Sequence, residues 1–315
     1  MESNEQTKAK ELVNYKALID YSKEGSTFKT LIGKPVLWLP VQVPQGGSVV
    51  KMLNDLFFKF KRLIRWYIFF DDNDKEFVDH ICDTIISVLE RYLTGDVIEA
   101  YDMFSEIMKK YGDTFPSKSV ETDIVYYRMR TGMDSTKKEQ FYHLPTTMRE
   151  KCSSQRFSIA GYPCFYVGYS KNDCLVEISK TGSMIGLTVN EKDSLRVLDL
   201  TLSDEQKDGE QLNKYLKAFP LIASCYVVMM NSVDEEKVKF REEYIIPQML
   251  TSYLKHQNKL DGICYYSVRN ENLHPLGRNE EDYRNLVLFP NLNSTEEHDM
   301  NLMNKFHWYE PFCIK

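Results

Sequence analysis

The feature that most constrains the fold is a change in the period of the apolar residues near residue 115. From residue 49 to residue 111, apolar side chains recur every three or four residues, as on the buried face of an amphipathic helix. After Pro116, β-branched and aromatic residues form short runs bounded by Gly, Pro, Asn and Asp, which is typical of strands. The chain is therefore predicted to have a helical part followed by a strand-rich part.

The helical part is predicted to contain three helices. Their apolar positions run over residues 49–67, 77–92 and 98–108. Capping and turn residues separate them at residues 71–74 and 94–96, and Gly112 with Pro116 beyond it supplies a stop. An antiparallel helical bundle is the expected packing. Residues 31–43, which contain two prolines, are expected to be extended but not to form a strand inside a sheet.

Seven short strands are expected after Pro116. They cover residues 124–130, 164–169, 174–179, 195–200, 221–229, 262–268 and 285–289, and one helix is expected at residues 246–257. Many short strands with few helices predict an α+β domain with a mixed or antiparallel sheet. No glycine-rich phosphate loop follows these strands, which argues against a Rossmann or P-loop fold. We expect a helical N-terminal domain over residues 1–115 and a second domain over residues 116–315.

Composition and charge argue against several classes of protein. The chain of 315 residues is 43% hydrophobic and 13% aromatic, far from the composition of a disordered protein. Its formal net charge of −6 opposes attraction to phosphate backbones, and no strong basic patch offsets that charge. We therefore expect no nucleic-acid partner.

The sequence also argues against export, membrane insertion and metal binding. The N-terminus is polar where a signal peptide has an apolar run, and the most apolar long stretch, residues 49–70, carries six charged residues. The seven cysteines form no Cys-x-x-Cys pair, and the histidines lack the spacing of metal ligands. We expect a cytoplasmic protein with free thiols, no metal and no membrane association.

Residues 126–178 carry the strongest chemical signal. Arginines fall on or beside predicted strands and close to tyrosines, at Arg128, Arg130 and Arg156. An arginine within an apolar strand needs an anionic partner, because the guanidinium stays charged at any accessible pH. Its partner would be either a phosphorylated ligand or a carboxylate such as Glu177.

The same residues have a simpler interpretation. Alternation along a strand would turn Tyr127 and Met129 inward, and Arg128 and Arg130 outward on a solvated face. Glu177 would then lie on the polar face of a half-exposed strand or helix. Composition and periodicity leave both interpretations open and indicate no reaction.

An ordered set of short motifs resembles a known family. The set is YYRMR from residue 126, QRFS from residue 155, GYPCFY from residue 161 and YYSVR from residue 265, with Glu177 eleven residues after Tyr166. Over roughly residues 124–290 the chain resembles the RES domain family, which is named for an Arg, a Glu and a Ser. Members of that family consume NAD and are related in fold to ADP-ribosyltransferases. The resemblance therefore implies an ADP-ribosyltransferase-like sheet domain.

The resemblance assigns roles residue by residue. It places the family arginine at Arg128 or its neighbour Arg130, the pocket tyrosine at Tyr166, the glutamate at Glu177 and the serine at Ser267. Arg156 takes the place of the arginine in a Gly-Arg-aromatic motif, although Gln155 and Phe157 stand where glycine and tryptophan are usual. The implied substrate-binding residues are Tyr127, Arg130, Arg156 and Arg269.

The implied reaction is cleavage of the bond between nicotinamide and ribose in NAD. Its oxocarbenium-like transition state needs a carboxylate near the ribose, a role for Glu177, and needs no metal. Arg128 and Arg156 would bind the pyrophosphate, and Tyr166 the ribose end. The acceptor would be phosphate, water or a protein side chain; we favour phosphate, for which Arg130 or Arg269 would supply a further positive charge. No cofactor is expected beyond NAD as substrate and inorganic phosphate as co-substrate.

Partners and alternatives follow from the same resemblance. Many family members are the toxin of a toxin–antitoxin pair, so an antitoxin or other inhibitory protein is the partner that the resemblance implies in addition to NAD. A homo-oligomer is a further partner state that the sequence leaves open. The N-terminal helices would be an accessory module with a HEPN-like fold. Two other functions stay open: a nucleotide-binding module without turnover, and a HEPN-type ribonuclease using residues 269–274, which Pro275 and the acidic charge disfavour.

Overall fold

The computed structural model describes residues 35–67, 69–131, 136–178, 181–201, 209–230, 238, 240–268, 284–292 and 297–314. The chain divides into two compact units, the first made of Met1–Phe115, Leu202–Ile246 and Leu273–Gly277, the second of Pro116–Thr201, Pro247–Asn272 and Arg278–Lys315. Residues 202–246 thus cluster with the N-terminal unit, unlike in the expected division. Compactness alone says nothing of what each unit does, so an accessory domain at 1–115 and a catalytic domain at 116–315 stay predictions.

In the first unit, three helices follow the apolar period of the sequence. They are α3 (Val49–Arg65), α4 (Asp72–Leu93) and α5 (Val97–Tyr111), and the short turns η1 (Pro35–Leu37), η2 (Gly112–Thr114) and η6 (Glu242–Tyr244) lie in the same unit. Ser48, Asp71 and Asp96 each accept a first-turn N–H and so begin these helices. Gly95 follows α4 with a φ of 92°, which favours glycine. The three predicted helices are confirmed.

A fourth helix of this unit replaces most of a predicted strand. Helix α7 (Gly209–Cys225) covers the first part of residues 221–229, and only β7 (Val227–Met229) is extended. The prediction was wrong because this stretch is buried almost throughout, and a continuous apolar run does not distinguish a buried helix from a buried strand. Strand β7 pairs in parallel with β1 (Val41–Val43), so residues 31–43 do contain a sheet strand, contrary to expectation.

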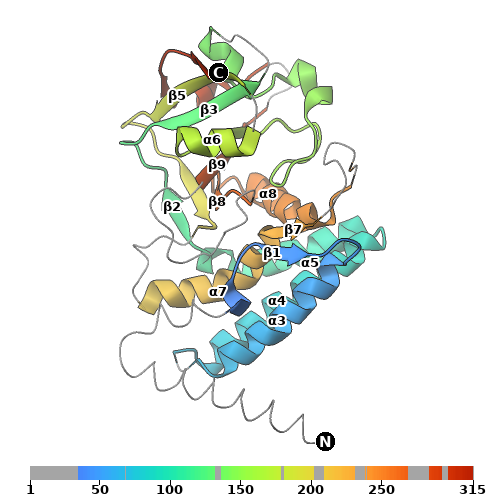
Figure 1. The fold of residues 1–315 in the computed structure, drawn as a ribbon. Helices are drawn as coiled ribbons and strands as arrows, with labels where there is room; N and C mark the ends of the chain where they lie inside the picture. Colours follow the sequence, from blue (N-terminus) through green and yellow to red (C-terminus); the bar gives the residue numbers. More distant parts are fainter. Residues whose placement is uncertain are drawn as a thin grey trace, which may run out of the picture. The chain divides into compact units, whose positions relative to one another are not determined.

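The second unit is built on a mixed sheet (Figure 1). Its described strands are β2 (Ser117–Ser119), β3 (Tyr126–Thr131), β4 (Phe165–Gly168), β5 (Gly182–Val189), β6 (Arg196–Asp199), β8 (Gly262–Tyr266), β9 (Arg284–Leu288), β10 (Phe306–Trp308) and β11 (Phe312–Ile314). They lie in the order β10-β5-β3-β4-β9-β8-β6-β2, with β11 also paired to β5. Among the described pairs of this sheet, β6 with β8 is parallel and the others are antiparallel. The α+β class with a mixed sheet is confirmed.

The helical segments of the sheet unit are α6 (Lys171–Ile178), most of α8 (Ile245–Gln257), α9 (Met300–Met303), η3 (Lys138–Phe141) and η4 (Thr146–Lys151). Helix α6 stands where the sequence analysis expected a strand at residues 174–179. Its first turn is held by a reciprocal cap, because Asp173 Oδ2 accepts the N–H of Ser170 at 2.6 Å and Ser170 Oγ accepts the N–H of Asp173 at 3.2 Å. Such a cap begins a helix. Strand β5 was not predicted.

The two faces of the sheet have different partners. On one face, Tyr126 packs into a large apolar cluster with Phe165, Leu187 and Cys264. On the other face, Met129 packs with Cys174 of α6. Helix α6 therefore covers the β3 and β4 side that carries Met129, and Figure 1 shows it beside β3. No helix among the described residues is long and apolar enough to cross a membrane.

Candidate active site

Two arginines lie where β3 and β4 separate. The two strands are paired at Tyr127 and Gly168 alone. One position further along β3, the guanidinium of Arg128 donates through Nη1 to the main-chain carbonyl of Tyr166 on β4, at 2.5 Å. Arg128 thus occupies the place where the backbone ladder between the strands stops.

Arg130 lies next to Arg128 and shares one acceptor with it. The carbonyl oxygen of Tyr142 accepts from Nη2 of Arg128 at 3.4 Å and from Nη2 of Arg130 at 2.5 Å. Arg130 also donates through Nε to the carbonyl of Gln140, at 3.2 Å. Among the residues that the structure describes, no carboxylate pairs with either arginine, and their recorded hydrogen bonds end on main-chain carbonyls.

The positive charge of this arginine pair is poorly compensated. Arg128 is only 8% exposed, and its Nε has no hydrogen-bond partner within the described part of the chain. Burial first, and then the like charge of Arg130, hold the pKa of Arg128 well below its ordinary value. Burial also lowers the pKa of the half-buried Arg130. Because a buried charge needs an opposite charge, the pair is a candidate anion site.

The simpler interpretation of these strand residues fails for Arg128. That interpretation placed its side chain on a solvated face, whereas the guanidinium lies 4.8 Å from the ring centroid of Phe165 and is buried. The inward packing of Tyr127 and Met129 is as expected, since both contact the cluster beneath α6. The carbonyl contacts also give Arg128 a structural role, because they tie β3 to β4 and to residue 142.

Glu177 lies on α6, over the sheet. Its Oε1 accepts a hydrogen bond from Nδ2 of Asn285, at 2.9 Å. Asn285 is 5% exposed and lies on β9 opposite Gly168 of β4. Glycine at 168 lets the helix approach, because a Cβ there would lie 2.8 Å from the Cβ of Asp173. The position of the Glu177 carboxylate thus depends on the packing of α6 against Gly168 and on the hydrogen bond from the buried amide of Asn285.

Tyr166 contacts the turn that carries Arg156. The hydroxyl of Tyr166 lies 2.7 Å from Oγ of Ser158. Ser158 closes a turn with Gln155, and Arg156 and Phe157 form its tip. Phe157 is buried with its ring 4.7 Å from that of Tyr265, whereas Arg156 stays half-buried.

Contacts within the sheet connect the strands and the helix that carry these residues. Burial raises the pKa of the Cys174 thiol, which lies on α6 three residues before Glu177, to about 12. That thiol donates to the carbonyl of Tyr127 at 3.1 Å. In the neighbouring strand pair, Tyr265 of β8 lies opposite Asn285 of β9, whose side chain donates to Glu177.

The remaining predicted residues are Ser267, Tyr127 and Arg269. Ser267 follows β8 and is fully buried, with 0% exposure. Tyr127 is half-buried, and Nζ of Lys171 lies 5.6 Å from its ring centroid. Arg269, together with the ribonuclease-like motif of residues 269–274 and Pro275, lies outside the described residues. No group of three or more His, Cys, Asp or Glu side chains within the described ranges could hold a metal ion.

The sequence analysis missed Asn285, although its neighbours gave a signal. It is a polar residue at the start of a run, NLVLF, whose other members are apolar and buried. A buried amide in such a run must have a polar partner, because leaving it unpaired is costly. Nothing in the sequence names that partner.

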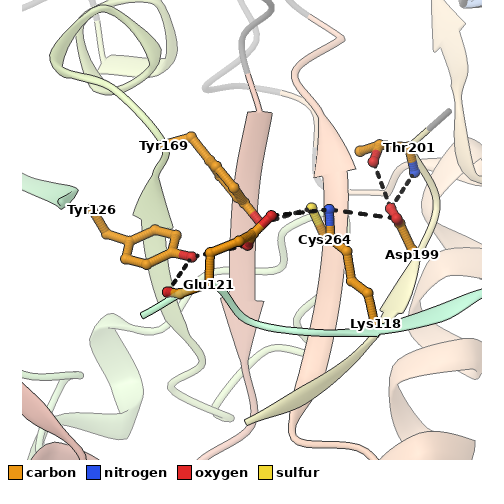
Figure 2. Close-up of polar contacts among 7 residues, drawn as sticks. All are labelled: Lys118, Glu121, Tyr126, Tyr169, Asp199, Thr201 and Cys264. Carbon is orange, nitrogen blue, oxygen red and sulfur yellow. Dashed lines mark hydrogen bonds and ion pairs between the residues drawn. The ribbon is translucent and has the colours of Figure 1, made fainter. Parts of the chain in front are cut away.

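A second polar cluster in the sheet unit has a different character (Figure 2). Asp199 accepts from the N–H and hydroxyl of Thr201, at 2.9 and 2.5 Å, and pairs with Nζ of Lys118 at 3.4 Å. Glu121 accepts from the hydroxyls of Tyr126 and Tyr169, and the thiol of Cys264 donates to Tyr169. Each side chain drawn has a partner within the network, and charges of opposite sign are paired. The cluster therefore stabilises the sheet and is not a candidate site.

Comparison with known proteins identifies the family. The RES domain model matches residues 127–306, more than half of the chain. "Putative toxin YopC" of Bacillus subtilis (strain 168) is 26% identical over 228 residues, which cover 64% of this chain and 51% of that protein. The chain thus spans about half the length of this relative. No solved structure is a significant match.

The matched range contains the residues singled out above. It starts at Tyr127 and includes Arg128, Tyr166, Glu177 and the turn with Arg156. It does not reach the N-terminal helices, so their HEPN-like fold stays a prediction. Motif order, matched range and fold class agree, and the chain belongs to the RES domain family.

Proposed function

We propose that this protein degrades NAD by cleaving the bond between nicotinamide and ribose, with inorganic phosphate as the favoured acceptor. One observation supports the proposal most. The pair of Arg128 and Arg130 is positively charged, at least half-buried and, among the described residues, without a carboxylate. The pyrophosphate of a dinucleotide supplies the anion that such a pair needs.

Glu177 is the proposed catalytic carboxylate. Cleavage builds positive charge on the ribose, and a fixed carboxylate stabilises that charge without a metal. The hydrogen bond from Asn285 to Oε1 fixes the orientation of the Glu177 carboxylate, which would face the ribose. Tyr166 would contact the ribose end, and Arg156 would bind phosphate next to the arginine pair.

The proposed biological role is supported by the name of the relative. YopC is named a putative toxin, and depletion of NAD is a direct way to arrest a cell. We propose the same role here, with an inhibitory protein partner that keeps the enzyme inactive. The phosphate, water and protein acceptors share the first half of the reaction, so the products distinguish them.

The test is the concentration of NAD over time with purified protein, with and without inorganic phosphate, and with products resolved by chromatography. Loss of NAD that needs phosphate and yields a phosphorylated ADP-ribose supports the phosphorylase. Loss without phosphate supports a hydrolase instead. No loss in either tube, from folded protein free of any copurified inhibitor, would move the assignment to a protein-directed transferase or to a binding module without turnover.

A substitution at the carboxylate tests the mechanism. Glu177→Gln keeps the shape of the side chain and removes its charge, so we expect the rate of NAD loss to fall by about a thousandfold or more, as for removal of a transition-state electrostatic group. The matched control is Glu191→Gln, at an exposed glutamate outside the site, which should keep the full rate. An active Glu177→Gln protein would remove Glu177 from the mechanism.

A further inference from the structure

The segment that carries Arg156 is a tight turn. The N–H of Gln155 donates to the carbonyl of Ser158 at 2.9 Å, and the N–H of Ser158 donates back to the carbonyl of Gln155 at 3.2 Å. Phe157 anchors the tip in the core, with 1% exposure. The backbone of this turn therefore sets where the side chain of Arg156 begins.

Helix α8 is hydrogen-bonded to this turn through one side-chain amide, that of Gln248. Nε2 of Gln248 lies 2.7 Å from Oγ of Ser154, 2.9 Å from the carbonyl oxygen of Gln155 and 3.2 Å from that of Ser158. The two hydrogens of the amide are thus shared among three acceptors. One helical turn further on, the hydroxyl of Thr251 donates to the carbonyl of Phe157 at 3.1 Å.

Gln248 also acts on Tyr166. Ser158, whose carbonyl accepts from Gln248, contacts the hydroxyl of Tyr166 through its own Oγ, at 2.7 Å. One amide therefore holds both the segment that carries Arg156 and the hydrogen-bond partner of Tyr166. Gln248 lies about ninety residues away in the sequence and belongs to none of the family motifs quoted above.

We propose that Gln248 is a positioning residue for the dinucleotide site, acting through the turn of residues 155–158 without touching the substrate. The inference rests on the function proposed above. Without the amide, the carbonyls of Gln155 and Ser158 lose their donor from α8, and the turn is held less firmly in its position against that helix. A displacement of about 1 Å at a group that orients substrate costs up to about a hundredfold in rate or affinity.

The test compares three variants on α8. Gln248→Leu removes both donors, and Gln248→Glu keeps the size but turns a carboxylate toward the three acceptors. The matched control is Ser252→Ala, because the hydroxyl of Ser252 donates to the backbone carbonyl of Gln248 at 2.9 Å and leaves the amide in place. Each protein is assayed for KM and kcat of NAD loss and for its Tm.

We expect Gln248→Leu to raise KM for NAD about tenfold, and Gln248→Glu to raise it further, with a smaller change in kcat. Ser252→Ala should match the wild type. A purely structural role would lower Tm and the amount of active protein without moving KM. If KM is unchanged in both Gln248 variants, or if only kcat falls, the inference is wrong.

Two controls keep this result separate from the proposed function. If neither the wild type nor Ser252→Ala consumes NAD, the proposed function is wrong. That outcome differs from active wild type with an unchanged KM in the Gln248 variants, which refutes only the role of Gln248. If both Gln248 variants do not fold, Thr251→Val replaces them, because it keeps the size of the side chain and removes the hydroxyl that donates to the carbonyls of Phe157 and, within α8, of Pro247. We expect that variant to raise KM about threefold, and an unchanged KM would overturn the inference.

Discussion

Gly168 is the point at which a single methyl group should displace helix α6, which carries Glu177. A Cβ at this position would lie 2.8 Å from the Cβ of Asp173 and 3.1 Å from Sγ of Cys174, both in α6. Carbon atoms in contact lie about 3.5–4.0 Å apart, so Gly168→Ala requires the first turn of α6 to move by about 1 Å. Both neighbours are buried, and no flexible side-chain end is available to yield.

The expected cost has two parts. Overpacking of a close contact lowers the free energy of unfolding by about 1–3 kcal/mol. Glu177 lies one turn beyond Asp173 and moves with the helix, so its 2.9 Å hydrogen bond to Asn285 lengthens. We expect the rate of NAD loss per folded molecule to fall by about ten- to a hundredfold, as for other misplaced catalytic groups.

Urea unfolding and the rate of NAD loss measure the two parts separately. The matched control is Gly112→Ala, because Gly112 has a helical φ of −57° and a Cβ there meets nothing within 4 Å. This control should keep both stability and rate. If Gly168→Ala behaves like Gly112→Ala, α6 does not pack on β4 as described. A destabilised variant with the full rate would show that the position of Glu177 does not matter.

Further predictions concern one hydrogen bond and two titrating groups. Asn285→Leu should slow NAD loss about tenfold while Tm stays within a few degrees, because it removes the donor to Glu177; an unchanged rate would contradict this role. Burial raises the pKa of Asp173 from 3.8 to about 6, so its contribution to the free energy of unfolding is full below pH 3.8 and is lost as pH rises through 6. Urea unfolding should show wild type losing about 2–3 kcal/mol relative to Asp173→Asn between pH 4 and pH 7. Burial lowers the pKa of His143 from 6.5 to about 4, so its contribution is present above pH 6.5 and is lost as pH falls through 4. Relative to His143→Gln, wild type should therefore gain about 3 kcal/mol over the same rise in pH, and a flat difference for either variant would refute the corresponding assignment.

The sequence by itself determined the elements that meet solvent on one side. The three N-terminal helices follow from the helical period of the apolar residues, which separates a buried face from a solvent-exposed face. Their caps at Ser48, Asp71 and Asp96 follow from local hydrogen bonding. The α+β class follows from short runs with turn residues between them. Even the start of α6 was encoded, in the spacing of Ser170 and Asp173, although the apolar run after it favoured a strand.

The residue types of the candidate site could also be predicted from the sequence. The arginines, Tyr166 and Glu177 stand in an ordered set of motifs, and the matched family range contains them. Their order along the chain does not say which of them lack a carboxylate partner. That property depends on which parts of the chain surround Arg128 and Arg130 in the fold. Their guanidinium groups donate to the main-chain carbonyls of residues 140, 142 and 166.

Tertiary structure alone decided the rest, for two physical reasons. Where every residue of a segment is buried, as over residues 218–227 at the end of α7 and the start of β7, periodicity vanishes and the local pattern no longer distinguishes helix from strand. Contacts between distant residues, such as Asn285 with Glu177 and Gln248 with the turn of residues 155–158, arise from packing. The amides of Asn285 and Gln248 look like ordinary polar residues in the sequence, and only the folded sheet and helix bring them to the groups that they hold.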